Sequence, residues 1–307
     1  MNATGLRVLG SRRYGALSPL RYPGGKAALA GFFADIISSL GLTNVRYVEP
    51  YAGGVGAGIA LLRRGIIDNL VINDIDPAVF CFWTSVVRDN ARFVEMVEQA
   101  PLTIDQWHTQ RAIYKARDES DPLALGFAFF YLNRTNRSGI LNAGVIGGQK
   151  QTGTYKIDAR FNRAALIERL TVLSDLADRI TVSDLDGRTV IRTYASDDHA
   201  LMYIDPPYVQ AGSRLYLNAF EGRDHQALAK IVNNIDKAHW LMTYDTSPWI
   251  EKLYRDHFQC RLELTYAAHK PGRAEELLIA SPSVAQVVTG LQSHLAPVCA
   301  ANASGQD

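Results

Sequence analysis

The chain has 307 residues, of which 47% are hydrophobic and 21% are charged, and its formal net charge at pH 7 is +1. This composition is typical of a soluble globular protein with one large domain or two, and it excludes a polycation. No run of about 18 apolar residues occurs and the N-terminus has no apolar signal core, so no membrane span or signal peptide is expected. The three cysteines, Cys81, Cys260 and Cys299, are too far apart for a disulfide framework or a zinc site and favour a cytoplasmic location.

The first part of the chain has a βαβ pattern. Residues 45–48 predict a short strand that enters the glycine-rich turn 52–56. A helix is expected over 57–64, with Gly65 as its stop, and a second strand over 70–72. This order of elements predicts a parallel sheet.

Between about 80 and 165 the pattern becomes helical. Helices are expected over 78–99, 105–117 and 122–132, followed by an irregular loop or hairpin over 133–163. An α/β pattern then resumes, with helices at 162–178 and 223–236 and strands at 180–182, 201–204, 240–243, 259–267 and 276–280.

These elements predict a discontinuous sheet domain that carries an insert. The sheet domain comprises residues 1–81 and 164–295, and the insert comprises 82–163. The tail 296–307, rich in Ala, Asn, Ser and Gly, is expected to be disordered.

Basic residues gather in two segments of this nearly neutral chain. Residues 1–30 contain five basic side chains and no acid, and residues 125–165 contain six basic side chains and one acid. Local basic patches suit a partner that carries phosphates, although solvated surfaces are the alternative.

The strand at 201–204 ends in Asp205-Pro206-Pro207-Tyr208. The two prolines fix φ and disfavour helix before them, so the carboxylate and the ring follow a stiff, extended corner. An acceptor and a flat ring suit a planar ligand with an amino group, such as a nucleobase. An ordinary turn with a packed aromatic is the alternative reading.

Acids also follow the two earlier strands. Glu49-Pro50 precedes the glycine turn and suits a ligand amino group, and Asp74 at the end of the next strand suits ribose hydroxyls. A nucleoside with an amino-acid tail, such as S-adenosylmethionine, satisfies both acids. The alternatives are an NAD-type dinucleotide and a tight turn without a ligand. Lys26, near a predicted helix start, suits a ligand carboxylate or is simply solvated.

Taken together, these segments resemble the Dam-like (D12 class) site-specific DNA adenine-N6 methyltransferases. The similar segments follow the order of that family over most of the chain: 22–26, 49–54, 73–76, 131–135 with Gly139, 183–185, 205–208, 240–245 and 276–280. The resemblance implies an α/β fold, a Rossmann-like S-adenosylmethionine-dependent methyltransferase sheet with a mostly helical DNA-recognition insert.

The family's activity is transfer of a methyl group from S-adenosylmethionine to N6 of a flipped-out adenine in a specific sequence of double-stranded DNA. S-adenosylhomocysteine is then the product and no metal is needed. The resemblance further leads us to expect a monomer in the cytoplasm of a bacterium or phage host, associated with the nucleoid. A restriction endonuclease acting on the same site would be a separate partner.

The resemblance also assigns site residues. The expected catalytic residues are Asp205, Pro206 and Tyr208. The expected cofactor-binding residues are Tyr22, Lys26, Glu49, Tyr51, Gly53, Asp74, Asp184 and Asp205. The expected DNA-binding residues are Asn133, Arg134, Arg137 and Asn142. Asn142 stands where members that methylate GATC typically carry arginine, and Asn reads guanine less well than Arg, which argues against GATC as the target.

Three other readings share this pattern. N4-cytosine methyltransferases more often carry Ser before Pro-Pro, and enzymes that methylate RNA or protein amides usually carry Asn, so Asp205 favours adenine. A DNA-binding protein that has lost catalysis is the third, and the intact Glu49 and Asp205 argue against it.

Overall fold

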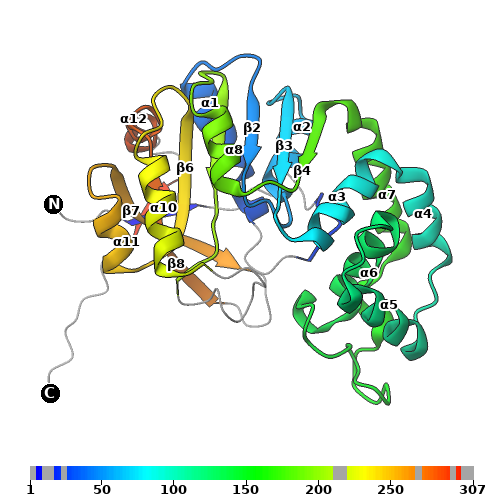
Figure 1. Ribbon diagram of the computed structural model, residues 1–307. Helices are drawn as coiled ribbons and strands as arrows, with labels where there is room; N and C mark the ends of the chain where they lie inside the picture. Colours follow the sequence, from blue (N-terminus) through cyan, green and yellow to red (C-terminus); the bar gives the residue numbers. More distant parts are fainter. Residues whose placement is uncertain are drawn as a thin grey trace, which may run out of the picture.

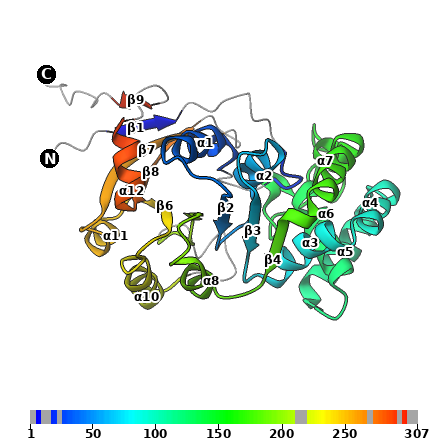
Figure 2. The ribbon, with the colours of Figure 1, turned by 90° about the horizontal axis from the view of Figure 1, so that it is seen from above.

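The computed structural model describes residues 5–8, 17–21, 26–209, 220–266, 272–290 and 295–298. The strands in these ranges form one nine-stranded sheet in the order β4-β3-β2-β5-β6-β8-β7-β1-β9. Helices cover both faces of this sheet (Figures 1 and 2). The predicted α/β, Rossmann-like class is confirmed by this strand order and by the parallel pairing described next.

Five neighbouring strands are parallel: β2 (Arg46–Glu49), β3 (Asn69–Asn73), β4 (Ile180–Ser183), β5 (Ala200–Ile204) and β6 (His239–Asp245). From β2 the sheet grows through β3 and β4 on one side and through β5 and β6 on the other. The chain order therefore reverses between β2 and β5. In open α/β sheets, ligands bind outside the carboxyl ends of the strands at such a switch point.

The second half of the sheet is mixed. β8 (Gly272–Ala280) runs antiparallel to both β6 and β7 (Phe258–Tyr266). β1 (Gly5–Val8) pairs parallel with β7, and β9 (Leu295–Val298) pairs antiparallel with β1. The tail expected to be disordered from 296 thus joins the sheet up to 298, since an edge strand leaves backbone groups for another strand to pair with. Residues 299–307 lie outside the described part.

Alternating side chains of the central strands divide the core in two. Tyr47 belongs to the apolar core on one face, and its neighbour Val48 belongs to the core on the other. The first face is covered by α1 (Ala30–Ser39), preceded by the 3-10 turn η1 (Lys26–Leu29), by α2 (Gly56–Arg63) and by α12 (Pro282–Gly290). The second is covered by α8 (Gly187–Tyr194), α10 (Gly222–Val232) and α11 (Pro248–Leu253) (Figure 2). The sequence had not predicted α8, α11 or α12.

Five helices lie at and beyond the β4 edge of the sheet (Figure 1). They are α3 (Pro77–Arg88), α4 (Asn90–Gln99), α5 (Ile104–Ala116), α6 (Pro122–Thr135) and α7 (Arg163–Asp175). The single helix expected over 78–99 is in fact two, because Asp89 has a non-helical backbone with φ −132° and ψ 41°. Asn90 at the break donates from Nδ2 to the carbonyls of Val86 and Leu170 and so ties α3 to α7.

Close packing joins α3 to α6. A Cβ on Gly126 of α6 would lie 2.7 Å from the carbonyl oxygen of Cys81, and the rings of Phe82 and Phe130 are stacked with centroids 5.9 Å apart. The segment after α6 is irregular, as expected, and contains the 3-10 turns η2 (Arg137–Gly139) and η3 (Ile157–Arg160). A further 3-10 turn, η4 (Ala177–Arg179), leads into β4. The division of the chain into a sheet domain and an insert at 82–163 stays a prediction.

Among the helices of the described ranges, none combines the length and the apolar character that a bilayer crossing requires.

Candidate active site

Asp205 directly follows β5, at the switch point of the sheet. Its Oδ1 accepts from Thr243 Oγ1 at 2.8 Å and from the Tyr208 hydroxyl at 3.0 Å. Its Oδ2 lies 3.1 Å from Lys26 Nζ. The carboxylate is therefore held by its own Pro-Pro corner and by two segments that are distant in the chain, β6 and η1.

Lys26 lies in η1 and its side chain is only 8% exposed. Its ammonium group contacts Asp205, the Tyr208 hydroxyl at 3.1 Å and the Glu276 carboxylate of β8 at 3.4 Å. Burial alone would lower the pKa of this lysine, but the charges and hydrogen bonds of Asp205 and Glu276 together raise it. Lys26 is thus a charged lysine buried between two carboxylates, and not a solvated one.

Glu49 ends β2, beside β5. Burial, reinforced by the negative charge of Asp205, raises its pKa to about 8, against the opposing effects of the Gly58 N–H, Tyr47 and Lys26. A Cβ at position 58 would lie 3.2 Å from Glu49 Oε1, so the helix after the glycine turn approaches this acid closely. We call Glu49, Asp205, Glu276 and Lys26 the acidic group. In it, Lys26 forms ion pairs with Asp205 and Glu276, and the charges of Asp205 and Lys26 act on the buried Glu49.

Asp74 follows β3 and stabilises the glycine turn. Its Oδ2 accepts from the Gly53 N–H and its Oδ1 from the Asp76 N–H, both at 3.0 Å. Gly53 has φ +50°, a left-handed conformation that glycine adopts without a Cβ penalty. Burial raises the pKa of Asp74 to about 6, although the two N–H donors oppose this shift. Carboxylate oxygens have more than one acceptor site each, so ribose binding by Asp74 stays a prediction.

Asn73, at the end of β3, joins the ends of three strands. Its Nδ2 donates to the carbonyls of Pro50 and Leu185, and its Oδ1 accepts from the Leu185 N–H and the Ser183 hydroxyl. The sequence placed Asn73 in a family motif but gave it no role. Beside it, the apolar side chains of Ile75 and Leu185 are each 47% exposed after β3 and β4. Neighbouring exposed apolar groups at strand ends suit a flat, apolar ligand face.

The remaining predicted cofactor residues differ in placement. Asp184 is exposed after β4, as a ligand contact requires. Tyr51 is turned toward the α8 face: a Cβ on Gly187 would lie 2.5 Å from its ring, and its ring meets that of Phe220 edge-on. Tyr22 lies outside the described residues.

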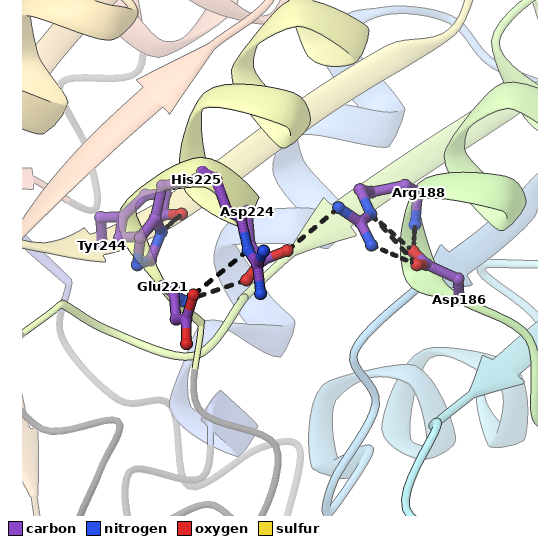
Figure 3. A network of polar contacts seen from close by, with 7 residues as sticks. Asp186, Arg188, Glu221, Asp224, His225 and Tyr244 are labelled. Atoms are coloured by element: carbon purple, nitrogen blue, oxygen red, sulfur yellow. Dashed lines mark hydrogen bonds and ion pairs between the residues drawn. The ribbon is translucent and has the colours of Figure 1, made fainter.

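A polar network borders the site on the α8 and α10 side (Figure 3). Asp186 caps α8 and forms an ion pair with Arg188, which also contacts Asp224 at the start of α10. His225 Nδ1 lies 2.7 Å from the Tyr244 hydroxyl, and the Tyr244 ring lies 6.2 Å from the ring of Tyr208. The network thus lies between the first turns of α8 and α10 and the rings of Tyr244 and Tyr208, of which Tyr208 contacts Asp205.

Asn133 and Arg134 lie in the last turn of α6 and are buried. The Asn133 amide pairs with both the N–H and the carbonyl of Arg21, at 2.7 and 2.9 Å, and also donates to the carbonyl of Gly139. DNA contact by Asn133 and Arg134 stays a prediction, and in this structure both side chains contact backbone of the segment 17–21. That backbone needs hydrogen-bond partners where it crosses the end of α6, and α6 supplies them.

Arg134 belongs to a cluster of four guanidinium groups. Burial lowers its pKa to about 9, and the positive charges of Arg21, Arg169 and Arg160 lower it further. Arg134 donates weakly to the Pro19 carbonyl at 3.5 Å, whereas its Nε has no partner among the described atoms. Arg169 donates to the Ser18 carbonyl at 3.0 Å. Within the described residues, the salt bridges include no acid paired with these four arginines. Such a cluster favours an anion.

The other two predicted DNA residues are exposed, in the loop after α6. Arg137 and Asn142 are both exposed there, and Tyr155 further along is 67% exposed. The loop is hydrogen-bonded within itself: Asn136 donates to the carbonyls of Ile140 and Leu141. Tyr155 was not predicted from the sequence, where an isolated aromatic among polar residues gives little signal.

The structure thus brings Lys26, Glu49 and Asp205 together, and places Asp74 and Asp184 after the two neighbouring strands. It adds Glu276, Thr243 and Asn73, which belong to segments that the sequence had flagged only as motifs. A carboxylate at a rigid corner therefore lies beside acids at adjacent strand ends, at the edge of a parallel sheet where ligands bind.

Comparisons with known proteins gave the following similarities. The rRNA methyltransferase aviRa from Streptomyces viridochromogenes aligns over 88% of this chain and 89% of its own, with a TM-score of 0.35 and 16% identity. The sequence is also 24% identical over 236 residues, 71% of this chain and 80% of the relative, to the Type II methyltransferase M.MjaIII from Methanocaldococcus jannaschii.

The family model for D12 class N6 adenine-specific DNA methyltransferases matches residues 22–268, which is most of the chain. The chain belongs to this family. It is accordingly a DNA methyltransferase that acts on N6 of adenine, and the N4-cytosine alternative is not favoured.

Proposed function

We propose that the methyl donor is S-adenosylmethionine and that it binds outside the carboxyl ends of β2, β3 and β4. The acidic group carries this proposal, because Glu49 is buried there beside Asp205 and its pKa of about 8 keeps it protonated near neutral pH. A cation placed next to Glu49 would favour its ionised form. A ligand with an ammonium and a sulfonium group supplies such a cation.

The residues around this crevice match the parts of that molecule. Glu49 suits the ammonium group, Asp74 suits the ribose hydroxyls, and Ile75 and Leu185 suit the two faces of the adenine ring. Asp184, exposed beside Leu185, suits the amino group of that ring. When bound, the cofactor supplies the electrophilic methyl group.

Asp205 and the carbonyl of Pro206 would accept hydrogen bonds from the amino group of the target adenine. The N6 lone pair is delocalised into the ring, which makes this nitrogen a weak nucleophile. Acceptors aimed at both N–H bonds favour a pyramidal nitrogen whose lone pair points at the methyl group. Holding the two reactants in line supplies much of the remaining acceleration.

The target base must leave the duplex to reach Asp205. Tyr208 would stack on the flipped base and offset part of the lost stacking, about 1–3 kcal/mol. In the present structure its hydroxyl is bonded to Asp205 and Lys26. Binding of adenine would therefore replace the Tyr208 hydroxyl at Asp205 by the amino group of the substrate.

Recognition of DNA is assigned to the loop after α6 and to the arginine cluster. Arg137, Asn142 and Tyr155 are exposed and free to meet DNA, whereas the four guanidinium groups around Arg134 suit a backbone phosphate. Asn133 and Arg134 would then act mainly by holding the segment 17–21 and the cluster in place.

We further propose that the protein acts as a monomer at the nucleoid of a bacterial or phage-infected cell. A target defined by a short sequence is also compatible with a separate restriction endonuclease that cuts the same site. Gel filtration of the protein with and without DNA tests the first proposal.

The proposed function is tested with S-adenosylmethionine carrying a labelled methyl group, in parallel reactions with mixed-sequence duplex DNA and with RNA, each followed by digestion to nucleosides. We expect label in N6-methyldeoxyadenosine. Label in N4-methyldeoxycytidine, or label on RNA and none on DNA, would contradict the proposal. Sequencing that detects modified bases in DNA from expressing cells then gives the target sequence.

A further inference from the structure

We propose that Tyr203 and Thr243 are positioning residues that orient Asp205 through a directed chain of hydrogen bonds. Tyr203 lies in β5, two residues before Asp205, and Thr243 lies in the neighbouring strand β6. The two hydroxyl oxygens are 2.7 Å apart, and Thr243 Oγ1 is 2.8 Å from Asp205 Oδ1. This inference rests on the proposed function, since it concerns the carboxylate that would hold the target amine.

The direction of these hydrogen bonds follows from the donors that are available. An ionised carboxylate only accepts, so the single hydroxyl proton of Thr243 is used toward Asp205. Thr243 can then only accept from Tyr203, so the Tyr203 hydroxyl donates to Thr243. Burial and the nearby charges of Asp205 and Glu276 hold the pKa of Tyr203 well above its usual value, so this tyrosine keeps its proton.

Burial fixes the position of this chain of hydrogen bonds within the site. Thr243 is fully buried and Tyr203 is 3% exposed. The ring of Tyr203 packs against Phe33 of α1 with centroids 5.0 Å apart, which fixes the position of its hydroxyl. Successive hydrogen bonds in a region of low dielectric polarise and strengthen one another.

This hydrogen-bond chain holds the same oxygen of Asp205 at which the target amine would replace the Tyr208 hydroxyl. Oδ1 accepts from Thr243 at 2.8 Å and from Tyr208 at 3.0 Å, while Lys26 Nζ lies 3.1 Å from Oδ2 and 3.4 Å from Oδ1. The bond from Thr243 fixes the rotation of the carboxylate and hence the direction in which Oδ1 can accept from the amine. A catalytic group needs this support because small errors in its position are costly to the rate.

The test compares Thr243→Val, Thr243→Ser and Tyr203→Phe with the unaltered protein in single-turnover methylation of duplex DNA. Valine keeps the shape of threonine without its hydroxyl, and serine keeps the hydroxyl. We expect Thr243→Val to slow the methyl-transfer step about 10- to 100-fold, the usual effect of one hydrogen bond to a charged group. Thr243→Ser should restore most of the rate, and Tyr203→Phe should slow it less, because Thr243 can still donate.

The affinities for S-adenosylmethionine and DNA are measured on the same variants and should stay within about twofold of the unaltered protein. A merely structural role would instead lower affinity, thermal stability and rate together, without rescue by serine, and would overturn the inference. An unaltered rate in Thr243→Val would also overturn it. Absence of adenine methylation by the unaltered protein would refute the proposed function itself, and this inference with it.

Discussion

At the scale of single residues, Asp205 is the group on which the proposed transfer depends. We expect Asp205→Ala to abolish methyl transfer and to leave S-adenosylmethionine binding measurable, because Glu49 and Asp74 remain after β2 and β3. The measurement combines a labelled-methyl assay with calorimetric titration of the cofactor. Asp236→Ala, at an exposed carboxylate after α10, is the matched control and should keep full activity. Undiminished transfer by Asp205→Ala would refute its role.

Glu49 gives a second prediction at this scale, on the dependence of stability on pH. Its pKa is about 8 in the folded protein, above the ordinary value of 4.5 expected when the chain is unfolded. Between these values the folded state keeps a proton that the unfolded state has lost. The free energy of unfolding should therefore fall as pH rises from about 4.5 to about 8, by an amount on the order of a few kcal/mol.

Glu49→Gln should flatten this part of the pH profile, since glutamine does not titrate. Its advantage over the unaltered protein should grow from pH 5 to pH 8, as measured by denaturant unfolding at each pH without cofactor. Glu98→Gln, at an exposed carboxylate of α4, is the control and should follow the unaltered protein. Parallel profiles for Glu49→Gln and the unaltered protein would contradict the assignment.

At the scale of elements, hydrogen bonds hold the strand ends of the site together. The Asn73 amide, at the end of β3, bonds to Pro50 after β2 and to Leu185 after β4. Asn73→Ala leaves the Pro50 carbonyl and the Leu185 backbone without these partners. We expect a loss of about 3 kcal/mol in the free energy of unfolding, as for buried polar groups left unpaired. Cofactor affinity should also fall, because Ile75 and Leu185 flank these hydrogen bonds.

Denaturant unfolding and cofactor titration check both effects of Asn73→Ala. Asn233→Ala is the matched control, since this exposed asparagine donates a single bond to the Leu253 carbonyl. Unchanged stability of Asn73→Ala would contradict this prediction and show that the strand ends do not need the Asn73 amide.

At the scale of the whole molecule, a nearly neutral protein must meet DNA through local charge. Arg137 is exposed in the loop after α6, whereas Arg134 is buried beneath it. We expect Arg137→Ala to weaken DNA binding and to reduce the slope of log affinity against log salt concentration by about 1, the value for one lost phosphate contact. Fluorescence anisotropy at several salt concentrations measures this slope.

Arg255→Ala removes an exposed arginine just after α11, a helix at the opposite end of the sheet from α6 (Figure 1), and should leave the slope unchanged. Equal slopes for Arg137→Ala and the unaltered protein would argue against a phosphate contact. Arg134→Ala should affect stability as well as DNA binding, because its side chain lies between α6 and the segment 17–21.

The sequence by itself determined the seven strands β2 to β8, the order of the motifs and the acids at the strand ends, whereas β1 and β9 were not predicted. Each of these acids, Glu49, Asp74 and Asp205, follows a short apolar run and precedes a turn rich in glycine or proline or the start of a helix. Such local patterns are visible in a single sequence. Parallel strands then carry such residues to one edge whatever the details of packing.

Only the tertiary structure decided which side chains support those acids. Lys26 meets Asp205 and Glu276 across 179 and 250 positions of the chain, and Thr243 meets Asp205 from a neighbouring strand. Arg134 reads as a surface cation in the sequence, but packing of residues 17–21 on α6 buries it. Contacts between distant segments leave no local pattern, because they depend on how whole elements pack and on which backbone groups need partners there.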